Sequence, residues 1–208
     1  MKIGKHTYGI ISGLVLSGLL ATTAFADTVR LKLAGTYPAN HFGNEILLNM
    51  IEEIEGAGVG LKINYFPASQ LGSGEELIED AIRGNVDLVS AFIYAQADPR
   101  LEVMNLPGLV TTFDELKSIY ANPESKLNTI LAEVMDDLGL VYLTNTGEGL
   151  IGIVANKKPI DHAGVGDKGM NIRVWSSEVA KKTTESLGYR TTTMNWAEVL
   201  PALQSGII

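Results

Sequence analysis

The first half of this 208-residue chain alternates strand-like stretches with helical patterns, and this alternation constrains the fold more than any other feature. Strand patterns at 29–33, 61–65 and 86–91 are separated by helical patterns at 46–54 and 74–83, and a glycine follows each helix. Strand–helix–strand units of this kind favour a parallel sheet with right-handed crossover connections. We therefore predict an α/β fold.

The second half follows a break at residues 98–108 and starts with the pattern of a longer helix. Asn122 suits the N-cap of this helix and Gly139 suits its end. Asn195 and Glu198 have the spacing of a capping box, which predicts the start of a last helix. Between the two helices, the residue pattern predicts strands at 140–144, 151–155, 172–174 and 189–193 and a helix at 177–187.

These elements predict two α/β lobes. The first lobe is expected at 27–121, a long helix and a crossing strand at 122–145, and part of a second lobe at 146–208. Parallel strands in both parts mean that ligands should gather at the carboxyl ends of the strands, where the connecting loops of an α/β protein meet.

Residues 1–26 have the pattern of a secretory signal peptide. Lys2 and Lys5 precede an uncharged run, and Ala24-Phe25-Ala26 has the small-x-small form of a cleavage site. A permanent membrane anchor is the alternative, but the uncharged run contains several Gly, Ser and Thr residues. We predict cleavage after Ala26, a periplasmic location in a Gram-negative cell, and no direct membrane anchor in the processed protein.

The charge balance excludes some classes of partner. Loss of Lys2 and Lys5 from 16 basic residues, against 24 acidic ones, leaves the processed chain with a formal charge of −10. This charge argues against binding to nucleic acid or to an anionic membrane surface. The chain contains no cysteine, so it has neither disulfides nor a site for lipid attachment at cysteine.

One arginine, Arg173, interrupts the apolar strand pattern Ile172-Arg173-Val174. Burial of its charge costs several kcal/mol or more unless an anion compensates for it, and a guanidinium does not lose its proton in proteins. The partner is therefore either an internal carboxylate or a bound one.

Five motifs, in order, carry a resemblance to a known family. The chain resembles the DctP-like solute-binding subunits of tripartite ATP-independent periplasmic (TRAP) transporters. The resemblance implies a two-lobed periplasmic solute-binding protein fold (type II-like) that closes on an organic acid and delivers it to a small and a large membrane subunit. From the residues themselves we expect no cofactor. The motifs are Phe66-Pro67-Ala68-Ser69-Gln70-Leu71-Gly72, Gly84-Asn85-Val86-Asp87, Leu106-Pro107, Met170-Asn171-Ile172-Arg173-Val174 and Glu198-Val199-Leu200-Pro201-Ala202-Leu203-Gln204-Ser205-Gly206.

The resemblance also assigns Arg173 as the carboxylate clamp. The family pattern continues past Ile208, so an incomplete second lobe is expected. Some members carry another arginine on the strand that precedes the polar segment at 156–168, where this chain has Gly152, Ile153 and Val154. The resemblance therefore does not point to the usual sugar-acid subtypes.

Further candidates for ligand contact lie at strand ends and helix starts. Glu75 could accept a ligand hydroxyl or simply favour the start of its helix. We place Trp175 in the cleft rather than Trp196, because Trp175 follows Arg173 and alternates outward from Val174. With Arg173, the candidate residues are Tyr37, Glu75, Tyr94, Asn145, Trp175 and Asn195.

Catalysis finds little support in the sequence. His41 and His162 are the histidines outside the leader, and neither has a neighbouring pattern of a nucleophile or of metal ligands. We expect no catalytic residue and no metal site. Two alternatives stay open: a receptor for another transporter or a sensor, and an extracytoplasmic hydrolase or lyase that acts on an acidic substrate.

Overall fold

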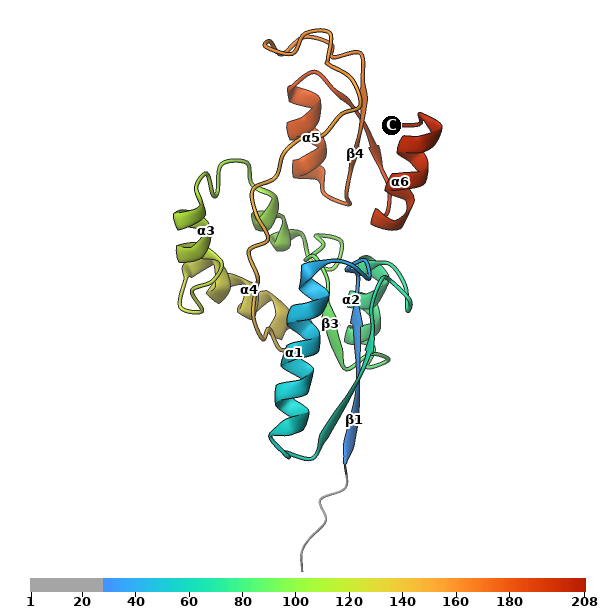
Figure 1. Ribbon diagram of the computed structural model, residues 1–208. Coiled ribbons are helices and arrows are strands. Elements are labelled where there is room, and N and C mark those ends of the chain that lie inside the picture. The colour runs from blue at the N-terminus through green and yellow to red at the C-terminus, as the bar shows by residue number, and fades with distance from the viewer. Residues whose placement is uncertain (1–27) are drawn as a thin grey trace, which may run out of the picture.

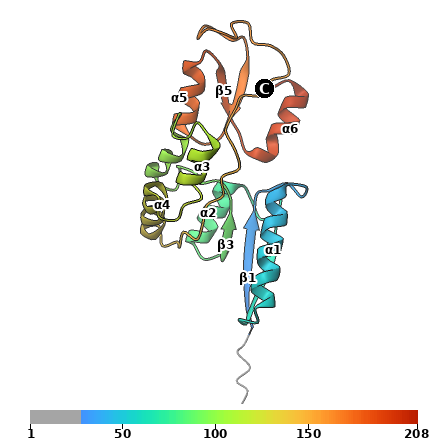
Figure 2. The ribbon, with the colours of Figure 1, turned by 60° about the vertical axis from the view of Figure 1, so that its left-hand side comes forward.

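The computed structural model describes residues 28–208, and the expected leader at 1–26 lies outside them. The first lobe contains a three-stranded parallel sheet in the order β2-β1-β3. Helix α1 packs against β2 and helix α2 against β3, as Figures 1 and 2 show. The prediction of an α/β lobe is confirmed. Its elements are β1 (Val29–Gly35), α1 (Phe42–Gly56), β2 (Leu61–Phe66), α2 (Gly74–Ile82) and β3 (Leu88–Ser90).

A helical layer follows the sheet: η1 (Pro99–Asn105), α3 (Phe113–Ile119) and α4 (Lys126–Asp137). Its apolar side chains form a core of Leu101, Leu127, Leu131, Val134 and Met135. The core forms because α4 presents one apolar face, with residues spaced three and four apart, to η1.

Two helix starts differ from the prediction. Helix α4 is capped by Ser125, whose Oγ accepts from Asn128 N at 3.1 Å, and not by Asn122. Helix α3 was not predicted, although Thr112 and Glu115 form a capping box that its sequence pattern contains. Helix α3 is too short to show a helical periodicity, so the capping box is the sequence feature that could have predicted it.

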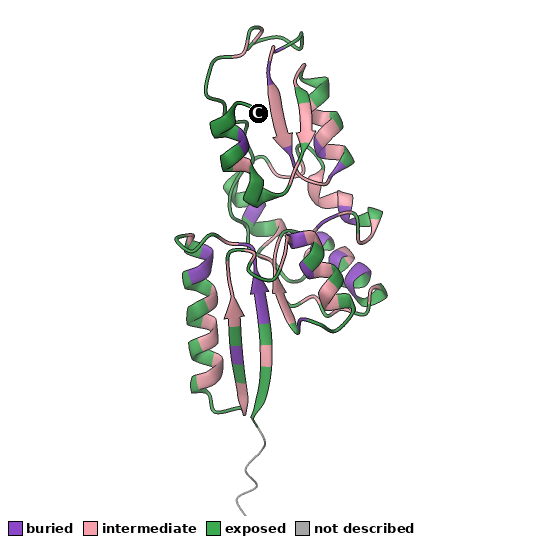
Figure 3. Cartoon of the chain, turned by 90° about the vertical axis from the view of Figure 1, so that its right-hand side faces the viewer, coloured by how far each residue is buried: buried purple, intermediate pink, exposed green. Residues whose placement is uncertain are grey.

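The second lobe contains β4 (Asn171–Val174), α5 (Glu178–Ser186), β5 (Arg190–Thr193) and α6 (Trp196–Ser205). Strands β4 and β5 are parallel, with Arg173 opposite Thr192. These elements confirm the predictions for residues 171–205. Figures 1 and 3 show this lobe at the far end of the molecule from the outer ends of β1 and β2.

The strands predicted at 140–144 and 151–155 are wrong. Neither segment belongs to a sheet, and Val141, Ile151 and Val154 are exposed at 81%, 80% and 92%. A short apolar run is a property of one segment, whereas a strand also needs a neighbour for its backbone hydrogen bonds. Among residues 28–208 no strand lies beside either segment, so the chain here only connects the two lobes.

Candidate functional site

A cavity of about 220 Å³ lies between the two lobes. The loops after β1 and β2, the first turn of α2 and Tyr94 form its first-lobe wall. The first turn of α6 forms the opposite wall, so the carboxyl ends of the parallel strands lead into the cavity, as in other α/β proteins. The lining residues are Thr36, Ser69, Gly72, Ser73, Gly74, Glu75, Glu76, Tyr94, Asn195, Trp196, Ala197 and Glu198.

Helix α2 begins at the cavity because Ser73 and Glu76 close a capping box there. The ring of Tyr94 lies so close to Gly74 that any side chain at this position would collide with it. Tyr94 is buried, and burial, followed by the charge of Glu75, raises its pKa to about 12. At neutral pH its hydroxyl is therefore a hydrogen-bond donor beside the Glu75 carboxylate.

Arg173 lies behind the opposite wall, on β4. Its Nε donates to Met194 O at 3.0 Å, and its guanidinium lies 5.6 Å from the centre of the Trp196 ring, which lines the cavity. Burial lowers the pKa of Arg173, while the nearby Tyr94 and Glu75 raise it. The site therefore brings the Arg173 guanidinium close to Tyr94 and to the Glu75 carboxylate from the first lobe.

Arg173 has no carboxylate partner within residues 28–208. The ion pairs in this range join Lys62 to Glu55, Arg83 to Glu79, and Arg100 to Asp98 and Asp137. The internal carboxylate considered as its counter-anion is thus absent from this part of the chain. A partly buried guanidinium without an anion can accept a bound one.

Arg173 is not one of the lining residues, whereas three further sequence candidates, Glu75, Tyr94 and Asn195, line the cavity. Asn195 caps α6, and its backbone N donates to Glu198 Oε2 at 3.1 Å, as the capping-box pattern predicts. All three were found because strand ends and helix starts meet at one edge of an α/β fold. Sequence reasoning missed Ser69 and Ser73, which lie in the Phe66–Gly72 motif and at the α2 cap.

Trp196, and not Trp175, lines the cavity. Trp175 Nε1 instead donates to Asn105 Oδ1 at 3.0 Å. The prediction assumed that strand alternation continues to Trp175, but β4 ends at Val174 and the chain turns, with Ser177 N donating to Trp175 O at 2.7 Å. Trp196 stands on the first turn of α6, which faces the first lobe.

Tyr37 and Asn145 do not line this cavity. The Tyr37 hydroxyl donates to Glu148, and burial, followed by that carboxylate, raises the Tyr37 pKa to about 12. Asn145 Nδ2 is buried with no hydrogen-bond partner among residues 28–208. His41, which we read as a turn residue, caps α1 by accepting from Gly43 N at 3.1 Å.

Residues 28–208 contain no cluster of three or more His, Asp or Glu side chains that could bind a metal ion. In the same range, each helix is too short or too polar to cross a bilayer. The residues that line the cavity offer hydrogen bonding, charge pairing and aromatic stacking.

Comparisons with known proteins place the chain among solute-binding proteins. "Uncharacterized protein YiiZ" of Salmonella typhimurium is 33% identical over 167 residues, which are 74% of this chain and 47% of that protein. A TRAP periplasmic solute-binding protein of Citrobacter koseri, solved with D-glucuronate, is 26% identical with a TM-score of 0.72 and covers 86% of this chain and 60% of its own. A TRAP periplasmic solute-binding protein of Xanthobacter autotrophicus Py2, solved with β-D-galacturonate, is 25% identical with a TM-score of 0.72 and covers 86% of this chain and 59% of its own.

The chain thus spans about half the length of YiiZ, at 47%, and somewhat more of these two solved proteins. The two-lobed α/β arrangement agrees with this similarity. The model of the bacterial extracellular solute-binding protein family 7, DctP, matches residues 33–208. This chain belongs to that family.

Proposed function

We propose that this chain is part of an extracytoplasmic receptor that binds an organic acid and delivers it to a TRAP-type secondary transporter. The observation that carries the proposal is Arg173, a partly buried cation behind the Trp196 wall of the cavity without a carboxylate partner among residues 28–208. A guanidinium binds a carboxylate through two parallel hydrogen bonds, and Nη1 and Nη2 of Arg173 are suited to this role once Nε is bound to Met194 O.

The ligand we propose is an acid with one carboxylate and several hydroxyl groups. A second carboxylate would meet the negative charge of Glu75, whereas a hydroxyl can donate to it. Ser69, Ser73 and Asn195 add polar groups that can bind hydroxyls. The Citrobacter and Xanthobacter proteins, solved with D-glucuronate and β-D-galacturonate, support this class. The sequence alone did not point to sugar acids, because residues 152–154 lack an arginine.

We further propose that the chain has no catalytic activity. The titratable side chains that line the cavity are Glu75, Glu76, Tyr94 and Glu198. Glu76 and Glu198 are engaged in the capping boxes of α2 and α6, and a phenol with its pKa raised to about 12 is a poor general base at neutral pH. The hydrolase or lyase alternative would require product formation from the bound acid. Release of unchanged ligand after incubation supports a receptor.

We expect the intact protein to bind D-glucuronate in titration calorimetry with one site. Succinate, which has two carboxylates and no hydroxyl, should bind more weakly because its second carboxylate meets Glu75. At a D-glucuronate concentration of 100 times Kd, binding should stabilise the protein by about 2.7 kcal/mol in thermal unfolding. Equal affinity for succinate and D-glucuronate would contradict the hydroxyl-acid assignment, and binding of neither acid would contradict the receptor.

The remaining proposals concern location and partners. We propose that a small and a large membrane subunit receive the ligand, in keeping with the TRAP proteins among the structural neighbours.

We propose that residues 1–26 are removed on export. Mass spectrometry of the protein from the periplasm of a Gram-negative host should show Asp27 as the N-terminal residue. Recovery of chains that begin at Met1 in the membrane fraction would instead indicate an anchored protein.

A further inference from the structure

We propose that Glu102 on η1 is a positioning residue that fixes the ligand-binding Arg173 by joining the two lobes directly behind β4. The proposal rests on the proposed function for the role of Arg173. The joint consists of Glu102 and Asn105 from η1 and Trp175, Ser177 and Glu178 from the second lobe. None of these residues lines the cavity, and Arg173 itself lies behind the wall formed by Trp196, so the joint acts on the ligand indirectly, through the position of Arg173 and its strand.

The Glu102 carboxylate contacts the N-terminus of α5. Its Oε2 accepts from Ser177 Oγ at 2.6 Å, and its Oε1 accepts from Glu178 N at 2.8 Å. Ser177 is itself the N-cap of α5, and its Oγ accepts from Ala180 N at 3.0 Å. A negative charge is favourable at a helix N-terminus, where backbone N–H groups lack partners. The first lobe thus supplies the anion that α5 needs.

Asn105 extends the joint to the end of β4. Its Nδ2 donates to Glu102 Oε2 at 2.9 Å, and its Oδ1 accepts from Trp175 Nε1 at 3.0 Å. Trp175 is two residues after Arg173, and β4 ends at Val174 between them. The hydrogen bonds therefore hold the chain on both sides of the turn that follows the Arg173 strand.

Burial raises the pKa of Glu102, but the hydrogen bonds from Ser177, Asn105 and Glu178 outweigh it, so the pKa is lower than that of an ordinary glutamate. The carboxylate is therefore ionised at neutral pH. Charge-assisted hydrogen bonds are stronger than neutral ones, which suits a contact that must resist movement of one lobe against the other.

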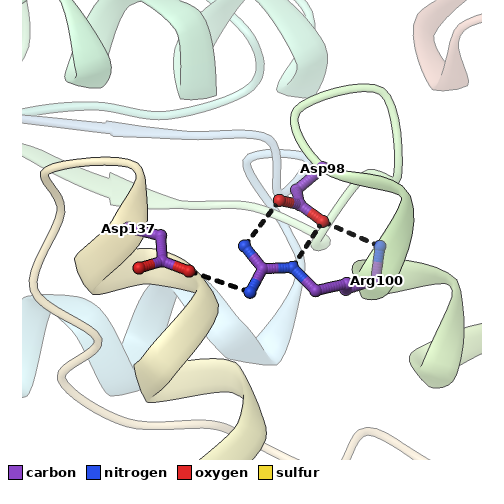
Figure 4. Close-up of polar contacts among 3 residues, drawn as sticks. All are labelled: Asp98, Arg100 and Asp137. Carbon is purple, nitrogen blue, oxygen red and sulfur yellow. Dashed lines mark hydrogen bonds and ion pairs between the residues drawn. The ribbon is translucent and has the colours of Figure 1, made fainter.

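Helix η1 is held firmly enough to position the second lobe. Leu101 is fully buried in the core against α4. On the exposed side, Arg100 Nη1 contacts Asp137 Oδ2 at 2.8 Å and Arg100 Nη2 contacts Asp98 Oδ2 at 2.8 Å, as Figure 4 shows. Arg100 and Leu101 thus fix η1 to α4, while Glu102 and Asn105 face the second lobe. A ligand-binding side chain such as Arg173 keeps its geometry only when the residues that support it are themselves held in place.

The test is Glu102→Gln in the intact protein, with Glu115→Gln as the matched control. Glu115 also closes a helix N-terminus, where its Oε2 accepts from Thr111 and Thr112, but it lies on α3 within the first lobe. Glu102→Gln should weaken D-glucuronate binding at least about tenfold, the loss expected for charged hydrogen bonds, and Glu115→Gln should change it less than about twofold. Equal losses in the two variants would show a general effect on stability and would overturn the proposal.

A second readout needs no ligand and separates this proposal from the proposed function. The indole N–H signals of Trp175 and Trp196 in ¹H–¹⁵N NMR spectra can be assigned with Trp175→Phe and Trp196→Phe. Trp175 reports the joint, and Trp196 reports the position of the Arg173 guanidinium that lies over its ring. Glu102→Gln should shift both signals, and Glu115→Gln neither. A shift of Trp175 alone would show that the joint does not position Arg173, whatever the protein binds.

Discussion

Replacement of Arg173 by methionine should remove most of the affinity of the intact protein for D-glucuronate. Truncation of one partner of a buried charged pair typically costs about 2–5 kcal/mol, much of it because the other charge is left buried and unpaired. Here the bound carboxylate would lose its cation, and the nearest charge from the other lobe, Glu75, is negative. Titration calorimetry measures the loss directly.

Arg173→Lys should lower the affinity for D-glucuronate at least about tenfold, but less than Arg173→Met does. A lysine keeps the charge, but it cannot offer two parallel hydrogen bonds or stack its head group on Trp196 as a planar guanidinium does. The matched control is Arg190→Met on the adjacent strand β5, because Arg190 is exposed, whereas Arg173 is partly buried beside Trp196 of the cavity wall. Unchanged affinity in Arg173→Met, or an equal loss in Arg190→Met, would exclude Arg173 as the carboxylate clamp.

The sequence predicted most elements because their signals are local. The α/β alternation of the first lobe, the capping box at Asn195 and the apolar face of α4 each depend on residues within one or two turns. The two incorrect strands failed for the opposite reason. Residues 140–144 and 151–155 are short, largely apolar runs, but the hydrogen-bonding neighbour that makes a strand is a non-local property.

The residues of the candidate site also separate into those that local sequence signals predict and those that depend on contacts distant in the sequence. Glu75, Tyr94 and Asn195 could be found because topology brings strand ends and helix starts to one edge. Tyr37 also follows a strand, yet its hydroxyl turns to Glu148 on the connecting segment, 111 residues away. The choice between Trp175 and Trp196 depended on whether β4 extends by one more residue, and strand boundaries are the least certain part of a sequence pattern.

The joint at η1 was not visible in the sequence at all. Glu102 lies in the stretch at 98–108, where the sequence pattern indicates a break. Its partners Ser177 and Glu178 lie 75 and 76 residues later. A carboxylate that caps a helix of another lobe leaves no local spacing to recognise. The element that connects the core of the first lobe to the clamp could therefore be found only from the structure.

Leu101→Ala should destabilise the intact protein by about 2–5 kcal/mol, the range for removal of a large apolar side chain from a packed core. Leu101 is fully buried, and its neighbours Leu127, Leu131, Val134 and Met135 stand on the rigid helix α4, so they cannot readily close the resulting cavity. The control is Leu143→Ala on the connecting segment, where the leucine is 72% exposed and the change should stay within about 0.5 kcal/mol. Urea unfolding followed by circular dichroism gives both values.

Because Leu101 fixes η1, which carries Glu102, its loss should also weaken D-glucuronate binding, whereas Leu143→Ala should leave binding unchanged. Equal stability of the two variants would place the principal core of the first lobe elsewhere than between η1 and α4.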